Sequence, residues 1–142
     1  MISNQAGVAY GYFKEEALKG VQQKVDELLL PAGVILDGYY FCPHHPKGTV
    51  QQYTFECDCH KPKPGMILQA AKDFHVNLSS SFMIGDILND VEAGKRAGCK
   101  GILLDNGNET EWILNEQRTP DKIVKNFKEA AEWIVHQLPK YP

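Results

Sequence analysis

The chain has 142 residues, of which 43% are hydrophobic and 23% charged, and its formal net charge is −3. This length and composition fit one ordinary globular domain with a core of its own. The slightly acidic charge, without a dominant basic face, argues against a general nucleic-acid-binding protein. No apolar run approaches the roughly 20 residues of a membrane span, and no apolar secretion segment opens the chain. We therefore expect a cytoplasmic protein without a membrane partner.

Strands and helices alternate along the sequence. Residues 1–7 are typical of the end of a strand that enters a polar loop. An apolar stripe then predicts an amphipathic helix up to Leu30, which Pro31 and Gly33 end. This alternation predicts an α/β fold with a mostly parallel sheet and helices on both faces. The remaining predicted elements are a strand over 34–41, a helix over 64–75, a strand over 81–85, a helix ending at 97, strands over 101–104 and 121–124, and a helix over 127–138.

Three of the four cysteines lie close together with a histidine, in the pattern Cys-x-His and then Cys-x-Cys. These residues are Cys42, His44, Cys57 and Cys59. Thiolate and imidazole donors suit zinc, and four protein ligands leave no open position for a substrate. We therefore predict a structural zinc site that stabilises a loop over about residues 42–63.

Two alternatives to a zinc site remain open for this cluster. Cys57 and Cys59 could form a redox pair, or the thiols could be unligated small hydrophobic residues. Cys99 lies apart from the cluster and is expected to be a packed thiol. Thiols that are grouped as metal ligands, not spread as disulfide partners, agree with a reducing compartment.

Three polar elements follow predicted strands, and the carboxyl ends of parallel strands meet at one edge of the sheet. They are the turn after Ser3, the residue Lys61 between the zinc ligands and a helix, and Gly85-Asp86 with Asp90 one helical turn later. A hydroxyl with nearby backbone N–H groups can hold a phosphate, and a lysine can neutralise it. Asp86 can supply a hard oxygen ligand to Mg²⁺. Taken singly, Ser3 and Asp86 could be caps and Lys61 a solvated surface residue.

The order of these motifs resembles the haloacid dehalogenase (HAD) superfamily of phosphatases. The zinc pattern resembles one branch, that of the D-glycero-D-manno-heptose 1,7-bisphosphate phosphatases, with the histidinol-phosphate phosphatases as the nearest alternative. The motifs are Ser-Asn-Gln-Ala-Gly, Cys-Pro-His-His-Pro, Cys-Asp-Cys-x-Lys-Pro-Lys-Pro-Gly-Met and Gly-Asp-x-x-x-Asp-Val-Glu-Ala-Gly, and the similarity extends over nearly the whole chain.

The resemblance implies a Rossmann-like core without a large cap domain, a catalytic Mg²⁺ and a structural Zn²⁺. The substrate would be a small sugar phosphate. Asp86 would be the Mg²⁺ ligand, and Asp90 would form hydrogen bonds behind it. The residues implied in phosphate or substrate binding are Ser3, Asn4, Gln5, His60 and Lys61, of which Lys61 and Ser3 would act in catalysis. Cys42, His44, Cys57 and Cys59 match the zinc ligands of the family.

Two positions differ from the pattern of this branch. His60 stands where arginine is common, and Ile87 stands where lysine is common. Both differences remove positive charge, and an imidazole lacks the guanidinium fork that binds phosphate through two parallel hydrogen bonds. These two differences bear on the choice of substrate and on the rate, not on the class of reaction.

The family's nucleophile is absent. It is an aspartate in an Asp-x-Asp-Gly motif on the first, central strand, and this chain starts at the second motif. Asp37-Gly38-Tyr39 lacks the second aspartate and falls in the strand before the zinc loop. We therefore expect residues 1–142 to be a single HAD-like domain that is truncated at its N-terminus and lacks that strand.

Two classes of function follow from these motifs. One is a Mg²⁺-dependent phosphomonoester hydrolase, inactive as this chain alone, in which loss of Lys61 would lower the rate far more than the stability. The other is a non-catalytic, zinc-stabilised binding module. We expect the full-length protein to be a monomer.

Overall fold

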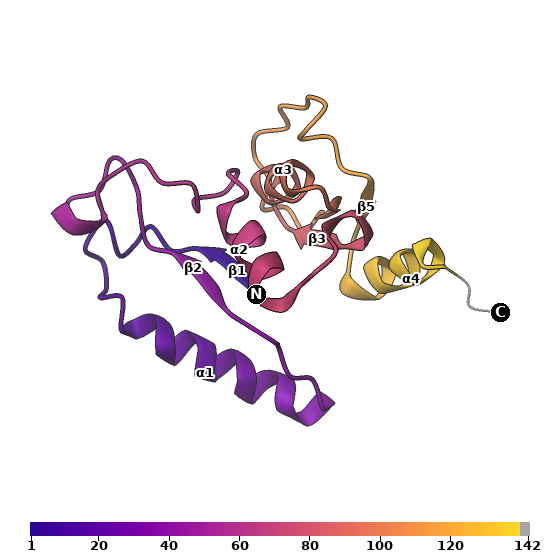
Figure 1. The fold of residues 1–142 in the computed structure, drawn as a ribbon, viewed down its shortest axis with the longest axis horizontal. Helices are drawn as coiled ribbons and strands as arrows, with labels where there is room; N and C mark the ends of the chain where they lie inside the picture. Colours follow the sequence, from indigo (N-terminus) through magenta and orange to yellow (C-terminus); the bar gives the residue numbers. More distant parts are fainter. Residues whose placement is uncertain (140–142) are drawn as a thin grey trace. The chain divides into compact units, whose positions relative to one another are not determined.

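A computed structural model describes residues 1–139, so residues 140–142, the end of the predicted domain 1–142, lie outside the described part. The described chain forms two compact units, residues 1–60 and the residues from Lys61 onward. Each unit has its own parallel sheet (Figure 1). Among residues 1–139, no helix combines the length and the apolar character that crossing a membrane requires.

A pair of short parallel strands organises the first unit. Its elements are β1 (Ile2–Asn4), α1 (Ala17–Leu29), η1 (Leu30–Ala32), β2 (Tyr40–Cys42) and η2 (Gln51–Tyr53). In the register of the two strands, Asn4 lies opposite Cys42. The backbone N–H of Gln5 extends the ladder by donating to the carbonyl oxygen of Cys42 at 2.7 Å. The loop after β1 and the loop after β2 therefore start side by side.

The strand predicted over residues 34–41 is shorter in the structure, where β2 begins only at Tyr40. The reason is the extent of its pairing with β1. In the ladder Tyr40 lies opposite Ile2, and the amine of Met1 donates to the carbonyl oxygen of Gly38. A strand is stable only where a neighbour satisfies its backbone groups. Val34 and Ile35 therefore lie outside the ladder and are exposed.

The helix predicted up to Leu30 forms as α1, but it buries little. Its only buried residue is Leu18, while Val21 and Leu28 on the same apolar stripe are exposed. The first unit as a whole has a small apolar core. Its buried hydrophobic residues are Val8, Ala9, Leu18 and Cys42.

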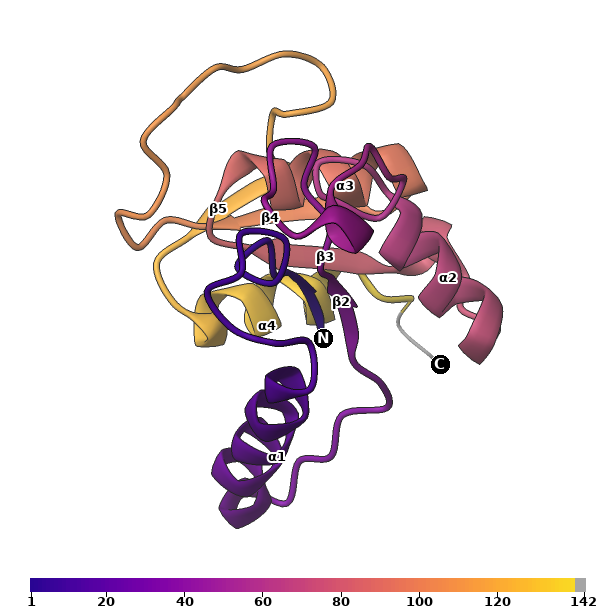
Figure 2. The same cartoon turned by 90° about the vertical axis from the view of Figure 1, so that its left-hand side faces the viewer.

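The second unit is a three-layer α/β arrangement. Its elements are α2 (Gly65–Phe74), η3 (Leu78–Ser80), β3 (Phe82–Gly85), α3 (Leu88–Ala97), β4 (Lys100–Leu104), β5 (Lys122–Val124) and α4 (Phe127–Gln137). The strands are parallel in the order β3-β4-β5. Helices α3 and α4 lie on opposite faces of this sheet (Figure 2). The prediction of an α/β fold with parallel strands and helices on both faces is confirmed.

Neighbouring residues of β4 supply the two faces of this core, as the alternation of side chains along a strand requires. Leu103 packs with Leu88 and Val91 of α3. Ile102 instead packs on the other face with Val124 and with Ala130 of α4. All of these side chains are fully buried or nearly so, and the second unit therefore has an apolar cluster on each face of its sheet.

Helix α3 lies unusually close to the sheet at Gly94. A Cβ atom at this position would overlap Cβ of Met83 in β3. Only glycine therefore allows the helix to approach the strand this closely. The helix ends at Gly98, whose φ of 98° is in the left-handed region that glycine tolerates.

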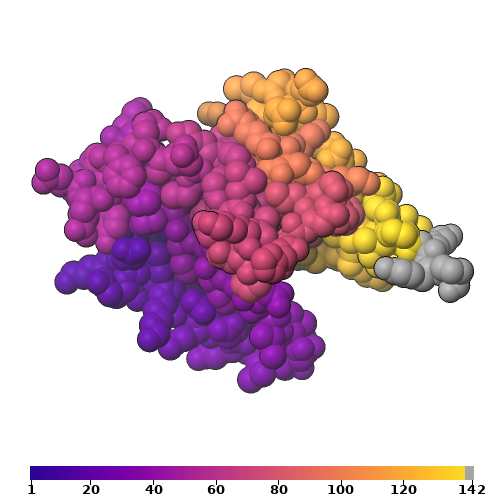
Figure 3. Space-filling model, viewed as in Figure 1, coloured from indigo at the N-terminus to yellow at the C-terminus, as the bar shows by residue number. Residues whose placement is uncertain are grey.

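A long loop after β4 is attached to α3 through Arg118. The loop's atoms stand at the surface of the second unit (orange in Figure 3). Arg118 Nη1 donates to Asn89 Oδ1 at 2.8 Å and to Glu92 Oε2 at 2.7 Å. The other carboxylate oxygen of Glu92 pairs with Arg96 at 2.5 Å. Glu92 is buried, so its charge depends on these two partners.

We predict that Arg118→Met destabilises the protein more than Arg96→Met does. The Arg118 side chain is 14% exposed and that of Arg96 is 43% exposed, so Arg118 is shielded from water far more. Losing its bonds to buried Glu92 should lower the free energy of unfolding by about 1–3 kcal/mol. Arg96→Met is the matched control and should cost less than about 1 kcal/mol. Urea unfolding of both variants tests the order, and equal losses would contradict it.

Candidate functional site

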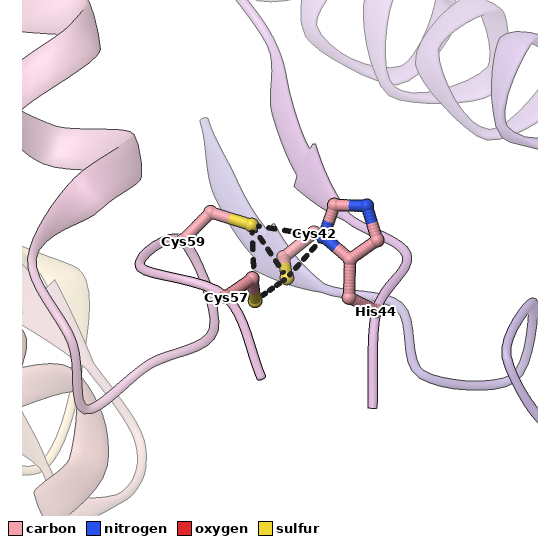
Figure 4. A group of neighbouring side chains, drawn as sticks. All are labelled: Cys42, His44, Cys57 and Cys59. Atoms are coloured by element: carbon pink, nitrogen blue, oxygen red, sulfur yellow. Dashed lines mark hydrogen bonds between the residues drawn. The ribbon is translucent and has the colours of Figure 1, made fainter. Parts of the chain in front are cut away.

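The four predicted zinc ligands converge in the first unit. Cys42, His44, Cys57 and Cys59 point toward one another (Figure 4), and their ligand atoms all lie within 4.8 Å of each other. Cys57 Sγ is 3.5 Å from Cys42 Sγ and 3.4 Å from Cys59 Sγ. Cys42 Sγ and Cys59 Sγ are 2.9 Å apart, and His44 Nδ1 is 3.3 Å from Cys59 Sγ. Cys42 is buried at the end of β2, and the other three are half-buried.

These four residues fit a tetrahedral zinc ion. Zinc bonds of about 2.3 Å to sulfur and about 2.0 Å to nitrogen place neighbouring ligand atoms about 3.5–3.8 Å apart. The shortest separation between the donors is 2.9 Å and all of them lie within 4.8 Å of one another, so small shifts bring them to that geometry. The set contains soft donors only and has no carboxylate. Such a closed set favours a structural ion over a catalytic one.

The three thiols of this cluster differ in acidity. Burial raises the pKa of Cys42 well above its ordinary value, and a hydrogen bond shared with Cys59 adds to this effect. Burial also raises the pKa of Cys57, but hydrogen bonds that its sulfur accepts from Cys59 and from the backbone N–H of His60 outweigh burial and lower it overall. Because zinc binds thiolates, binding has to remove a proton from Cys42.

We predict that the protein binds one zinc ion per chain through this cluster. Cys42→Ser should abolish stoichiometric zinc and lower the melting temperature, because the small core of the first unit cannot replace the lost ligand. Cys99→Ser, at a buried thiol in the second unit, is the matched control and should keep its zinc. The zinc content per chain, measured by metal analysis of the purified proteins, tests this prediction. Full zinc content in Cys42→Ser would contradict the assignment.

The predicted phosphate-binding turn follows β1 in the same unit. Gln5 Nε2 donates to Ser3 Oγ at 3.0 Å, and Ser3 Oγ lies 3.4 Å from the carbonyl oxygen of Asn4. All three residues are half-buried. Through the register of the strands, Asn4 lies next to Cys42. The structure therefore places Ser3, Asn4 and Gln5 beside the start of the zinc loop.

Lys61 is buried in the second unit, where its Nζ forms an ion pair with Asp90 Oδ1. The second oxygen of Asp90 accepts a hydrogen bond from the backbone N–H of Ile87 at 3.3 Å, at the start of α3. Gly85 makes room for this carboxylate, because a Cβ atom there would overlap the Asp90 side chain. Lysine, glycine and aspartate thus form one packed group.

Asp86 lies in the turn between β3 and α3 and is half-buried. Its Oδ2 accepts a hydrogen bond from Asn108 Nδ2 at 2.6 Å. The neighbouring Glu109 accepts a hydrogen bond from the backbone N–H of Leu88 at 2.5 Å, in the first turn of α3. The weak burial of Glu109 raises its pKa, but the bonds from Leu88 and from other backbone N–H groups lower it overall. A carboxylate near a helix N-terminus is favourable.

Sequence reasoning missed Asn108 and Glu109. The available signal was their position directly after a parallel strand, at the edge where polar side chains gather. It also did not identify Lys61 as the partner of Asp90.

The predicted site residues are divided between the two units. The first unit contains Ser3, Asn4 and Gln5, and the second contains Lys61, Asp86 and Asp90. The convergence of these two sets therefore stays a prediction. His60 lies against the zinc cluster, with Nδ1 3.8 Å from Cys42 Sγ.

We predict that Lys61→Met lowers stability as well as any activity, because burial of the ion pair gives Lys61 a structural role. This differs from the expectation from the sequence that its loss would lower the rate far more than the stability. The side chains of Lys61 and Asp90 are 11% and 5% exposed. Removing one member of a buried pair leaves a buried charge and costs about 3–5 kcal/mol. Lys61→Met/Asp90→Asn should recover much of that loss. Urea unfolding of both variants tests this, and a double variant less stable than the single one would contradict it.

Comparison with known proteins adds the evolutionary relationship. The sequence profile described as HAD-hydrolase-like matches residues 58–130. Over 100% of its length the chain is 45% identical to the D-glycero-beta-D-manno-heptose-1,7-bisphosphate 7-phosphatase of Photorhabdus laumondii, of which it spans 69%. The chain belongs to the HAD-like hydrolase family. The resemblance seen in the sequence motifs is thereby confirmed.

Two further members of this family are also similar in sequence to the chain. The phosphatase of the same name from Pasteurella multocida is 38% identical over 90% of the chain, which spans 74% of it. The one from Escherichia coli K12 is 35% identical over 100% of the chain, which spans 68% of it. The chain thus spans about two thirds to three quarters of these relatives.

Solved structures of HAD-like proteins share the fold. A HAD-like phosphatase from Mesorhizobium loti has a TM-score of 0.77 at 32% identity, and the match covers 94% of this chain and 62% of that one. D,D-heptose 1,7-bisphosphate phosphatase from B. bronchiseptica has a TM-score of 0.74 at 27% identity, with 96% and 73% covered. The second of these was solved with magnesium and phosphate.

Proposed function

We propose that this chain is the phosphate-binding and zinc-binding part of a Mg²⁺-dependent sugar-phosphate phosphatase that removes the 7-phosphate of D-glycero-D-manno-heptose 1,7-bisphosphate. The observation that carries this proposal is the match over the whole chain to enzymes of that name, at up to 45% identity among those compared. The product would be used in the synthesis of lipopolysaccharide precursors. The grouped thiols, none of them in a disulfide, are consistent with work in the cytoplasm.

In this proposal, Ser3, Asn4 and Gln5 bind the phosphate. Gln5 Nε2 donates to Ser3 Oγ, so the hydroxyl keeps its own proton to donate. That proton faces the carbonyl oxygen of Asn4 at 3.4 Å and would turn to a phosphate oxygen when phosphate binds. Lys61 supplies the positive charge that offsets the charge of the transferring phosphoryl group. Asp90 keeps the Lys61 ammonium in place through their buried ion pair. A lysine held in this way needs little rearrangement when the substrate binds.

Asp86 is the residue of this chain that would hold Mg²⁺. Its carboxylate is a hard oxygen donor in the turn after β3, and the bond from Asn108 fixes its orientation. When bound, Mg²⁺ supplies charge that offsets the negative charge of the phosphoryl group. Zinc, in contrast, would stabilise the loop over residues 42–63 and take no part in the reaction.

The 142 residues contain no Asp-x-Asp-Gly motif. The aspartate that attacks phosphorus and the one that protonates the leaving oxygen would therefore be supplied by residues outside this sequence. This chain alone would bind phosphate without turning it over. The missing motif also favours a second candidate function, a non-catalytic binding module stabilised by zinc.

An assay of phosphate release tests the proposal. The chain alone should release no phosphate from heptose 1,7-bisphosphate, and the protein extended upstream in its reading frame to include Asp-x-Asp-Gly should release one equivalent with Mg²⁺. Lys61→Ala in that extended protein should lower kcat by about 100-fold or more. Faster turnover of histidinol phosphate would move the proposal to that substrate. An upstream stop codon, with no activity, would favour the non-catalytic module.

A further inference from the structure

The imidazole of His60 contacts the zinc cluster in the first unit. Its Nδ1 is 3.8 Å from Cys42 Sγ, and its backbone N–H donates to Cys57 Sγ. One residue therefore reaches two of the three sulfurs, one through its ring and one through its backbone. Sulfurs that ligate a metal as thiolates retain negative charge and accept such N–H bonds, which orient them and tune the metal.

One aromatic residue, His45, packs against the His60 ring. His45 contacts it edge to face, with ring centroids 5.5 Å apart and an interplanar angle of 76°. The backbone N–H of Lys47 donates to His45 Nδ1 at 3.1 Å, and Tyr10 Oη lies 2.9 Å from the same nitrogen. A backbone N–H can only donate, so His45 Nδ1 is an acceptor and the neutral ring carries its proton on Nε2. The orientation of His45 is thereby fixed.

The contact with sulfur also determines which hydrogen bonds the other ring nitrogen of His60, Nε2, can form. If Nδ1 carries the proton that faces Cys42, the neutral ring has only Nε2 left, and Nε2 is then an acceptor. Phosphate oxygens and a sugar-phosphate anion need donors. His60 is therefore better placed to donate a hydrogen bond to a cysteine sulfur than to bind phosphate.

We infer that His60 is a positioning residue of the zinc cluster, whose Nδ1–H donates to the Cys42 sulfur and holds it in the geometry that the metal needs. This inference rests on the zinc assignment within the proposed function and does not depend on the substrate. It gives His60 a different role from the phosphate or sugar contact that the sequence suggested.

Zinc affinity of the whole chain tests the inference, measured by competition with a chromophoric chelator, together with the absorption spectrum after cobalt(II) replaces zinc. His60→Leu should weaken zinc binding by about 10- to 100-fold and shift the sulfur-to-cobalt charge-transfer band. His60→Asn should restore most of the affinity, because its amide carries an N–H at a similar reach from the backbone. His136→Leu, the same change at an exposed histidine of α4, should leave both readouts unchanged.

Two results would overturn the inference. One is His60→Leu with the zinc affinity and cobalt spectrum of the unaltered protein. The other is an equal loss in His60→Leu and His60→Asn, because packing and not the hydrogen bond would then account for it. If His60→Leu fails to fold by circular dichroism, the affinity of His60→Asn relative to His60→Ala decides. An unaltered chain that binds no zinc would refute the zinc assignment, whereas a missing phosphatase activity would leave this inference intact.

Discussion

The convergence of four ligand atoms at Cys42, His44, Cys57 and Cys59 is the constraint on which the first unit depends. Hydrophobic burial cannot take its place there, because few apolar residues of this unit are buried. Cys42 belongs both to the cluster and to β2, and its carbonyl oxygen accepts the backbone N–H of Gln5. The turn that would bind phosphate therefore takes its position from the same residue that would hold the metal.

The second unit is stabilised in a different way. Apolar side chains fill both faces of its sheet, so it can tolerate buried charge where that charge is paired. Lys61 and Asp90 use this tolerance, and Gly85 gives the carboxylate its space. A charged pair shielded from water keeps a defined geometry, which a solvated lysine would not. Stability and the proposed chemistry thus depend on the same side chains.

Local patterns in the sequence predicted the features that local chemistry determines. The grouping of the four candidate zinc ligands was predictable because their spacing within one loop is itself the signal. The layers of the second unit followed from the alternation of predicted strands and helices. The end of β2 was predicted to within one residue, but its start was not, because the pairing of β2 with β1 joins distant segments of the chain. The contacts of Asn108 and Arg118 join segments more than twenty residues apart, and no local pattern encodes them.

The four candidate zinc ligands lie within the segment from Cys42 to Cys59, which bears on how such proteins can diverge. The entropy of closing a loop grows only with the logarithm of its length, so doubling it costs about 0.6 kcal/mol. Residues 48–56 can therefore be lengthened, shortened or replaced while both ends of the loop keep their places in the candidate zinc cluster. A relative could acquire a new selectivity by changing this insert alone, and neither the sheet nor the ligands would have to change with it.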